Sequence, residues 1–163
     1  EAGNTENDAP VTEMDWQAAP VMFPYVQAGK EWRKPAFQLK LRNTSPRTLW
    51  FSLLYFGTDF SITNVLLPKQ AIEPGQEAWA SYVRSGYAYR TIPLQIDAPY
   101  LAQGMTALDE YLKVLVCTEE LDTDLLCQEG WKPTGGHRTL HLPEQPPQRD
   151  WKAVDVWIRI LRV

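Results

Sequence analysis

The chain has 163 residues, 44% of them hydrophobic, which is enough to bury the core of one globular domain. Its net charge is −4 and its pI about 5.2, so nucleic acid is not an expected partner. No apolar run reaches the ~18 residues of a transmembrane helix, so no membrane span is expected. Two cysteines are too few for a disulfide scaffold, which fits a reduced, cytoplasmic setting and leaves one extracellular disulfide as an alternative.

The first 30 residues contain few signals of regular structure. Residues 1–11 are acidic and polar, which predicts a disordered linker or tail, and we expect 12–163 to be a single β-sandwich domain. Weak alternation over 12–18 favours a short first strand. Two prolines bracket residues 21–23, which limits that segment to the edge of a sheet.

Residues 37–61 predict a β-hairpin that organises the chain. Residues 37–42 alternate apolar and polar side chains, so one face of that strand is open to solvent or a partner. Asn43, Ser45 and Pro46 break the strand through local side-chain bonds and a missing backbone donor. Residues 49–56 are almost wholly apolar, which predicts a central strand buried on both faces.

The middle of the chain continues the β pattern. Turn residues separate the expected elements, and Pro74-Gly75 is typical of a type II turn. The expected elements are strands at 62–67 (ended by Pro68), 77–83, 89–96 (an edge strand, because of Pro93) and 111–117, with a loop at 97–108.

The last part of the chain changes character twice. Leu121, Leu125 and Leu126, with Thr118 as N-cap, predict one short helix near 119–128. Residues 131–150 hold four prolines and two glycines, which predicts a long irregular loop. Residues 151–163 alternate and predict a long final strand that pairs with a central one. Together the segments predict an all-β fold, an antiparallel, immunoglobulin-like β-sandwich of about seven or eight strands.

Neither the cysteines nor the histidines predict a catalytic or metal site. Cys117 ends an apolar strand and is interpreted as buried and structural, and Cys127 is interpreted in the same way. His137 and His141 have a ligand spacing only on a helix, which the flanking Gly135-Gly136 and Pro143 oppose. We therefore expect solvated loop histidines, with no metal and no cofactor.

Two further groups of side chains have both a functional and a structural interpretation. The acids Glu119, Glu120, Asp122 and Asp124 suit the first turn of a helix, and a glycosidase would need two of them facing one cleft at ~5–10 Å. The aromatic residues could build a binding face, although most are expected in the core or in cross-strand pairs. The aromatic set is Trp50, Tyr55, Trp79, Tyr82, Tyr87, Tyr89 and Trp157.

Several short segments occur in a familiar order. They are Asn43-x-Ser45, Leu67-Pro68, Ile72-Glu73-Pro74-Gly75, Ala98-Pro99-Tyr100, 110–116, Thr118-Glu119-Glu120-Leu121-Asp122 and Trp151 with the last strand. This order, over about 37–163, resembles the β-rich accessory domain that follows the peptidase domain of bacterial caspase-like (metacaspase-type) proteins. The chain departs from the family pattern at Leu101, where family members often have Gly.

The resemblance implies a non-catalytic module that positions or regulates a peptidase domain, in the same chain or another protein, or recruits targets. Caspase-type peptidases place the catalytic His before the Cys, whereas both cysteines here precede both histidines. The alternative is a carbohydrate- or ligand-binding sandwich with a coplanar row of exposed aromatic rings. The candidate interaction residues, in loops 84–91, 97–108 and 131–150, are Tyr87, Tyr89, Tyr100 and Trp131.

Overall fold

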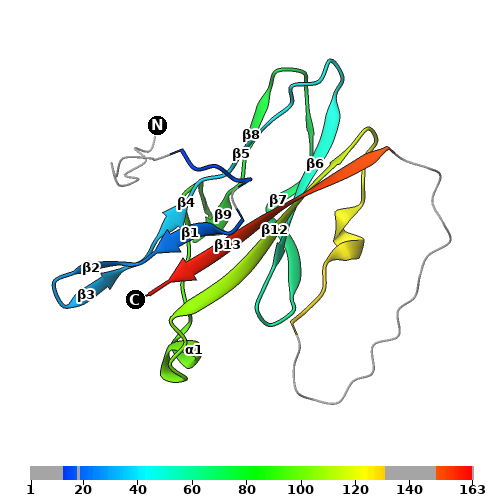
Figure 1. Cartoon of the computed structure of the whole chain (residues 1–163). Helices are drawn as coiled ribbons and strands as arrows, with labels where there is room; N and C mark the ends of the chain where they lie inside the picture. The colour runs from blue at the N-terminus through cyan, green and yellow to red at the C-terminus, as the bar shows by residue number, and fades with distance from the viewer. Residues whose placement is uncertain (1–12, 18, 131–149, 163) are drawn as a thin grey trace, which may run out of the picture.

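The computed structural model describes residues 13–17, 19–130 and 150–162, and in them the chain is mostly β-strand, as predicted. The largest element is a five-stranded sheet with the strand order β1-β13-β12-β6-β7 (Figure 1). Its strands are β1 (Val21–Pro24), β6 (Leu49–Phe56), β7 (Ile62–Ile72), β12 (Ala107–Cys117) and β13 (Trp151–Leu161).

Strands β12 and β13 pair along their whole length in antiparallel fashion, from Ala107↔Leu161 to Cys117↔Trp151. Their alternating sequences give the sheet two different faces. Leu112 and Ile158 belong to the inner face and join the core, whereas charged side chains meet across the strands on the outer face. The prediction that the final strand pairs with a central strand is confirmed.

Strand β6 lies between β12 and β7, and its four middle residues, 51–54, are buried, as its apolar sequence predicts. Strand β7 corrects the prediction that Pro68 ends the strand, because it continues to Ile72. The pairing shifts from Leu53↔Leu67 to Phe51↔Gln70, which is a bulge at Pro68. A proline is tolerated there because an edge strand leaves one row of amides unpaired, and a bulge interrupts the ladder.

The N-terminal segment differs from expectation in two ways. Residues 13–17 form no strand, so the predicted strand over 12–18 is wrong; the alternation there places no side chain in the core. Strand β1 is an edge strand, as predicted, but it runs parallel to β13, with Val21 opposite Ile158. The sheet is therefore mixed rather than wholly antiparallel.

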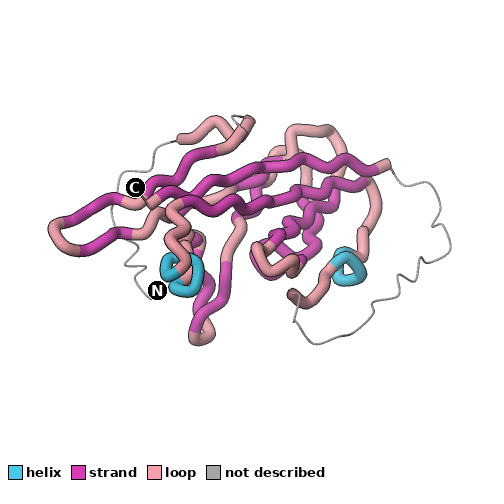
Figure 2. Tube along the Cα trace, turned by 60° about the horizontal axis from the view of Figure 1, so that its bottom comes forward, coloured by secondary structure: helices cyan, strands magenta, loops and turns pink. Residues whose placement is uncertain are grey.

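Eight short strands form four two-stranded sheets. They are β2 (Val26–Ala28) with β3 (Glu31–Arg33), β4 (Ala36–Phe37) with β11 (Ile92–Pro93), β5 (Lys40–Arg42) with β8 (Glu77–Trp79), and β9 (Tyr82–Arg84) with β10 (Tyr87–Tyr89). The described residues thus hold more strands than the seven or eight expected. The predicted strands 37–42, 77–83 and 89–96 are each divided, and β2 and β3 form where a turn was expected. Figures 1 and 2 show the β2–β3 hairpin projecting from the body.

The predicted hairpin over 37–61 does not form, because β5 pairs with β8 while β6 belongs to the large sheet. The chain passes from the β5–β8 sheet to the five-stranded sheet at Asn43, which is 1% exposed. Its side chain donates to the carbonyls of Arg47 and Ile72 at 2.7 Å and accepts from Ser45. The backbone of Asn43 joins this crossing to the Pro74-Gly75 turn, because its amide donates to Gln76 at 3.0 Å and its carbonyl accepts from Gly75 at 2.8 Å. In the turn, Gly75 has φ +76 and the amide of Gln76 donates to Glu73, as predicted.

One apolar core joins the inner face of the large sheet to the short strands, which lie on one side of it (Figure 2). The short strands contribute Ala78 and Ile92, and the loop after β11 contributes Leu94 and Ile96.

Both helical segments differ from expectation. The predicted loop 97–108 contains α1 (Ala98–Ala102), which has a proline in its first turn, a position that needs no backbone donor. The predicted helix near 119–128 is only the 3₁₀ turn η1 (Thr123–Leu126), whose N-cap is Asp122 and not Thr118. Leu125 is 76% exposed, so the expected apolar face does not form.

Candidate functional site

The β9–β10 hairpin presents two of the predicted interaction residues, Tyr87 and Tyr89. Ser85 and Gly86 both have positive φ (52° and 82°), as the two central positions of a tight hairpin turn require. Tyr89 pairs with Tyr82, and their rings stack with centroids 5.4 Å apart. Tyr87 lies at the tip and is 65% exposed. The hairpin therefore holds Tyr89 by stacking and offers Tyr87 to solvent.

Trp79 lies at the base of this hairpin, at the end of β8. The Arg90 guanidinium lies 5.3 Å from the centre of its ring, and the Lys40 ammonium lies 5.5 Å from it. Lys40 also pairs with Glu77 at 3.2 Å, and Arg42 lies opposite Glu77 in the β5–β8 ladder. We call Lys40, Arg42, Trp79 and Arg90 the Trp79 face. It combines cations with an aromatic ring, which is a composition common in protein interfaces.

The other two candidate residues do not join this surface. Tyr100 lies on α1, packs against the core and shares a hydrogen bond of 3.2 Å with the Thr58 hydroxyl. Trp131 lies outside the described residues, as do His137 and His141 and the loop predicted at 131–150. The sequence did mark Trp79 as a possible binding residue, and the polar face of 37–42 contains Lys40 and Arg42. The sequence did not show that the Arg90 guanidinium would lie over the Trp79 ring.

The outer face of the large sheet carries a second aromatic pair. Tyr111 and Trp157 stack with centroids 5.9 Å apart, and Arg159 lies 5.2 Å from the Trp157 ring. Arg159 also makes two 2.7 Å bonds to Asp109, which lower the pKa of that carboxyl. The ring faces of Trp157, like those of Trp79, contact other side chains. This geometry gives no support to sugar stacking at these rings.

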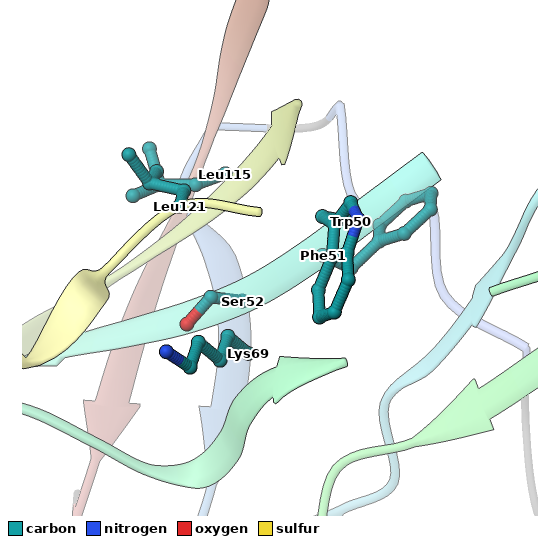
Figure 3. A pocket seen from close by; sticks show the side chains of 6 residues that line it. All are labelled: Trp50, Phe51, Ser52, Lys69, Leu115 and Leu121. Atoms are coloured by element: carbon teal, nitrogen blue, oxygen red, sulfur yellow. The ribbon is translucent and has the colours of Figure 1, made fainter. Parts of the chain in front are cut away.

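A shallow depression lies elsewhere on the same sheet, and Figure 3 shows Ser52 and Lys69 among its lining residues. A serine–lysine pair could act as nucleophile and base only if the lysine lost its proton. Lys69 instead pairs with Glu120 at 2.9 Å, which raises its pKa. Ser52 is buried and bonded to Thr123, and the depression is too small to enclose a water molecule. The pair is therefore structural.

The remaining acids and cysteines also have structural surroundings. Asp122 caps η1 by accepting from the amide of Asp124, so helix capping explains part of the acidic cluster. Cys117 is buried, as predicted, and Cys127 is half-buried with its thiol near the Thr123 carbonyl; both are unbonded to another cysteine. Within the described ranges no three His, Cys, Asp or Glu side chains are grouped to hold a metal.

Neither a family model nor a curated protein matches the chain. In the part of the chain that the structure describes, no helix is both long and apolar enough to cross a bilayer. The surfaces described above and the resemblance in the sequence are therefore the features that bear on function.

Proposed function

We propose that the chain is a non-catalytic interaction module that binds a protein partner through the β9–β10 hairpin. The observation that carries this proposal is the exposure of two large apolar side chains on one short hairpin: Tyr87 at 65% and Val83 at 73%. They lie on opposite faces of a two-stranded ribbon, because the register pairs Tyr87 with Arg84 and Val83 with Ala88. Exposed aromatic groups on a rigid support are typical of binding hot spots.

The sequence resemblance adds the class of partner. It supports a role beside a bacterial caspase-like cysteine peptidase, in which this module positions or regulates the peptidase domain or recruits its targets. The function does not depend on chemistry within the module, and the structural roles of Cys117 and Ser52 are consistent with that proposal.

The proposal requires that a caspase-like peptidase domain be encoded in the same gene as this chain or beside it, and the test uses that domain. Calorimetric titration of that peptidase domain should show binding that Tyr87→Ala weakens by about tenfold or more, because truncating a hot-spot residue removes at least ~1.4 kcal/mol. Tyr111→Ala, which removes an exposed tyrosine from the five-stranded sheet, is the matched control, and this variant should bind like the parent chain. Equal effects of the two variants would contradict the hairpin site. Peptide hydrolysis by this chain that disappears in Cys127→Ala would contradict the non-catalytic role.

A further inference from the structure

Two of the three cations of the Trp79 face, Arg42 and Arg90, have no acidic partner among the described residues. Arg42 and Arg90 are exposed and form no ion pair with a described residue, and Lys40 shares Glu77. The guanidinium of Arg90 is held against an indole ring, so part of its conformational freedom is already lost before any partner binds. Such a cation is prepared to receive an anionic group.

The charge of the surrounding segments has the same sign. Residues 31–49 and 77–96, which contain the short strands β3–β5 and β8–β11, hold only two acids, Glu31 and Glu77. Their basic residues are Arg33, Lys34, Lys40, Arg42, Arg47, Arg84 and Arg90. The whole chain nevertheless has a net charge of −4, so positive charge is concentrated in these segments. This distribution attracts an acidic partner and orients it during encounter.

The geometry of β5 sets the form of that partner. Leu41 packs against the core, so Lys40 and Arg42 both point outward, about 7 Å apart along the strand. An extended peptide with an acid at every second position presents carboxylates at the same spacing. Arg42 and Arg90 can each donate two parallel hydrogen bonds to a carboxylate, in the two-pronged geometry that a guanidinium favours.

We infer that the Trp79 face binds an extended acidic segment of a partner polypeptide, whose alternate carboxylates pair with Lys40, Arg42 and Arg90. The inference builds on the proposed interaction function and names the chemistry of one partner. Glu77 competes with the incoming segment, because Lys40 must give up its 3.2 Å ion pair with Glu77 before it can pair with an acid of the partner. Glu77 therefore weakens the binding of acidic segments.

The experiment measures binding of a short fluorescein-labelled peptide of alternating Glu and Ser by fluorescence anisotropy. Arg90→Gln and Arg42→Gln should each weaken binding by about five- to tenfold, the loss of one charge-assisted contact. Glu77→Gln should tighten it, and added salt should weaken it. Lys152→Gln, an exposed lysine at the start of β13 with the same charge change, is the control and should have no effect. A peptide of alternating Gln and Ser should not bind.

Three results would overturn the inference. The first is equal weakening by Lys152→Gln and Arg90→Gln, which would mean that only net charge matters. The second is tighter binding of an oligouridylate than of the acidic peptide, which would assign the face to nucleic acid. The third is an unchanged affinity in Glu77→Gln. Each leaves the peptidase titration with Tyr87→Ala intact, so failure here and failure of the proposed function are distinguishable.

Discussion

Glu110 is an acid on the inner, apolar face of β12, where it is 7% exposed. Burial raises its pKa, and a hydrogen bond from the Tyr55 hydroxyl opposes part of that effect. The same burial raises the pKa of Tyr55, and the charge of Glu110 adds to it. Alternation along 107–117 assigns position 110 to the core face, but only the structure shows the phenol that makes the acid tolerable there.

Glu110→Gln should stabilise the protein at neutral and alkaline pH. A carboxyl whose folded pKa is raised favours folding fully below the unfolded value, 4.5, and that contribution is lost as the pH rises through the folded pKa. The amide cannot ionise but can still accept from Tyr55. Urea unfolding should therefore give similar free energies for both proteins at about pH 4, and a higher value for Glu110→Gln at about pH 8.

Asp155→Asn is the control for this experiment, because Asp155 is an exposed acid on the neighbouring strand β13. It should not reproduce the stabilisation at high pH. If Glu110→Gln were less stable than the parent chain at both pH values, the carboxylate would be making a favourable contact in the folded state. The interpretation of Glu110 as a desolvated acid would then be wrong.

At the scale of elements, the sequence identified strands more reliably than their partners. The apolar run 49–56 correctly predicted a strand, and the alternation over 37–42 predicted one strand where the structure has two short ones, β4 and β5. The proximity of these segments in sequence wrongly suggested a hairpin. The reason lies in Asn43, whose local bond to Ser45 was expected, whereas its bond to the Ile72 carbonyl joins segments 29 residues apart. No local pattern reports such a contact.

For the two helical segments, the sequence failed to predict the local structure itself. Leucine spacing near 119–128 suggested an amphipathic helix, but Thr123 is held between the Ser52 hydroxyl and the Asn64 amide, which fixes a 3₁₀ turn against the sheet. Helix α1 was missed because its five residues are too few to show a periodic pattern. In both cases, contacts with the large sheet decide the local conformation.

Gly86→Ala should weaken the β9–β10 hairpin and leave the core intact. Gly86 has φ +82, which costs an alanine about 1 kcal/mol, and a Cβ there would meet no atom within 4 Å. Strain is therefore the only effect of the substitution. Hydrogen exchange should accelerate by about fivefold in the hairpin amides and remain unchanged in β12. Binding to the peptidase should weaken, because the support of Tyr87 is lost.

Gly29→Ala is the matched control, since Gly29 also has positive φ and open space but lies in the β2–β3 hairpin. It should leave exchange in β9–β10 unchanged. Faster exchange throughout the large sheet in Gly86→Ala would show that the hairpin and the core unfold together. The hairpin would then not be an independent presenting element.

At the scale of the whole molecule, the all-β class and the central place of β6, β12 and β13 follow from alternation and apolar runs. The site was predictable in part: Tyr87 and Tyr89 were marked because they lie in or beside a predicted loop. Arg90 was not, because its contact with Trp79 depends on how β8 and β10 approach each other. Pairing between distant segments is therefore the information that the sequence pattern lacks.

Among the described residues, burial begins at β1. Residues 13–17 are exposed and form no strand, whereas Val21, Phe23 and Tyr25 are buried against the core. A chain that begins at Ala19 should unfold within about 0.5 kcal/mol of the full chain, because the described residues that it loses, 13–17, are exposed. A chain that begins at Gln27 loses β1, the three buried side chains and the bond from the Ile96 amide to the Tyr25 hydroxyl. Each large side chain contributes about 2 kcal/mol by burial, and the whole free energy of unfolding of a small domain is only ~5–15 kcal/mol.

Urea denaturation followed by tryptophan fluorescence should show a cooperative transition for the first truncation and none for the second. A cooperative transition in the second would mean that the parallel strand β1 is an accessory to the fold and that β13 can serve as its edge.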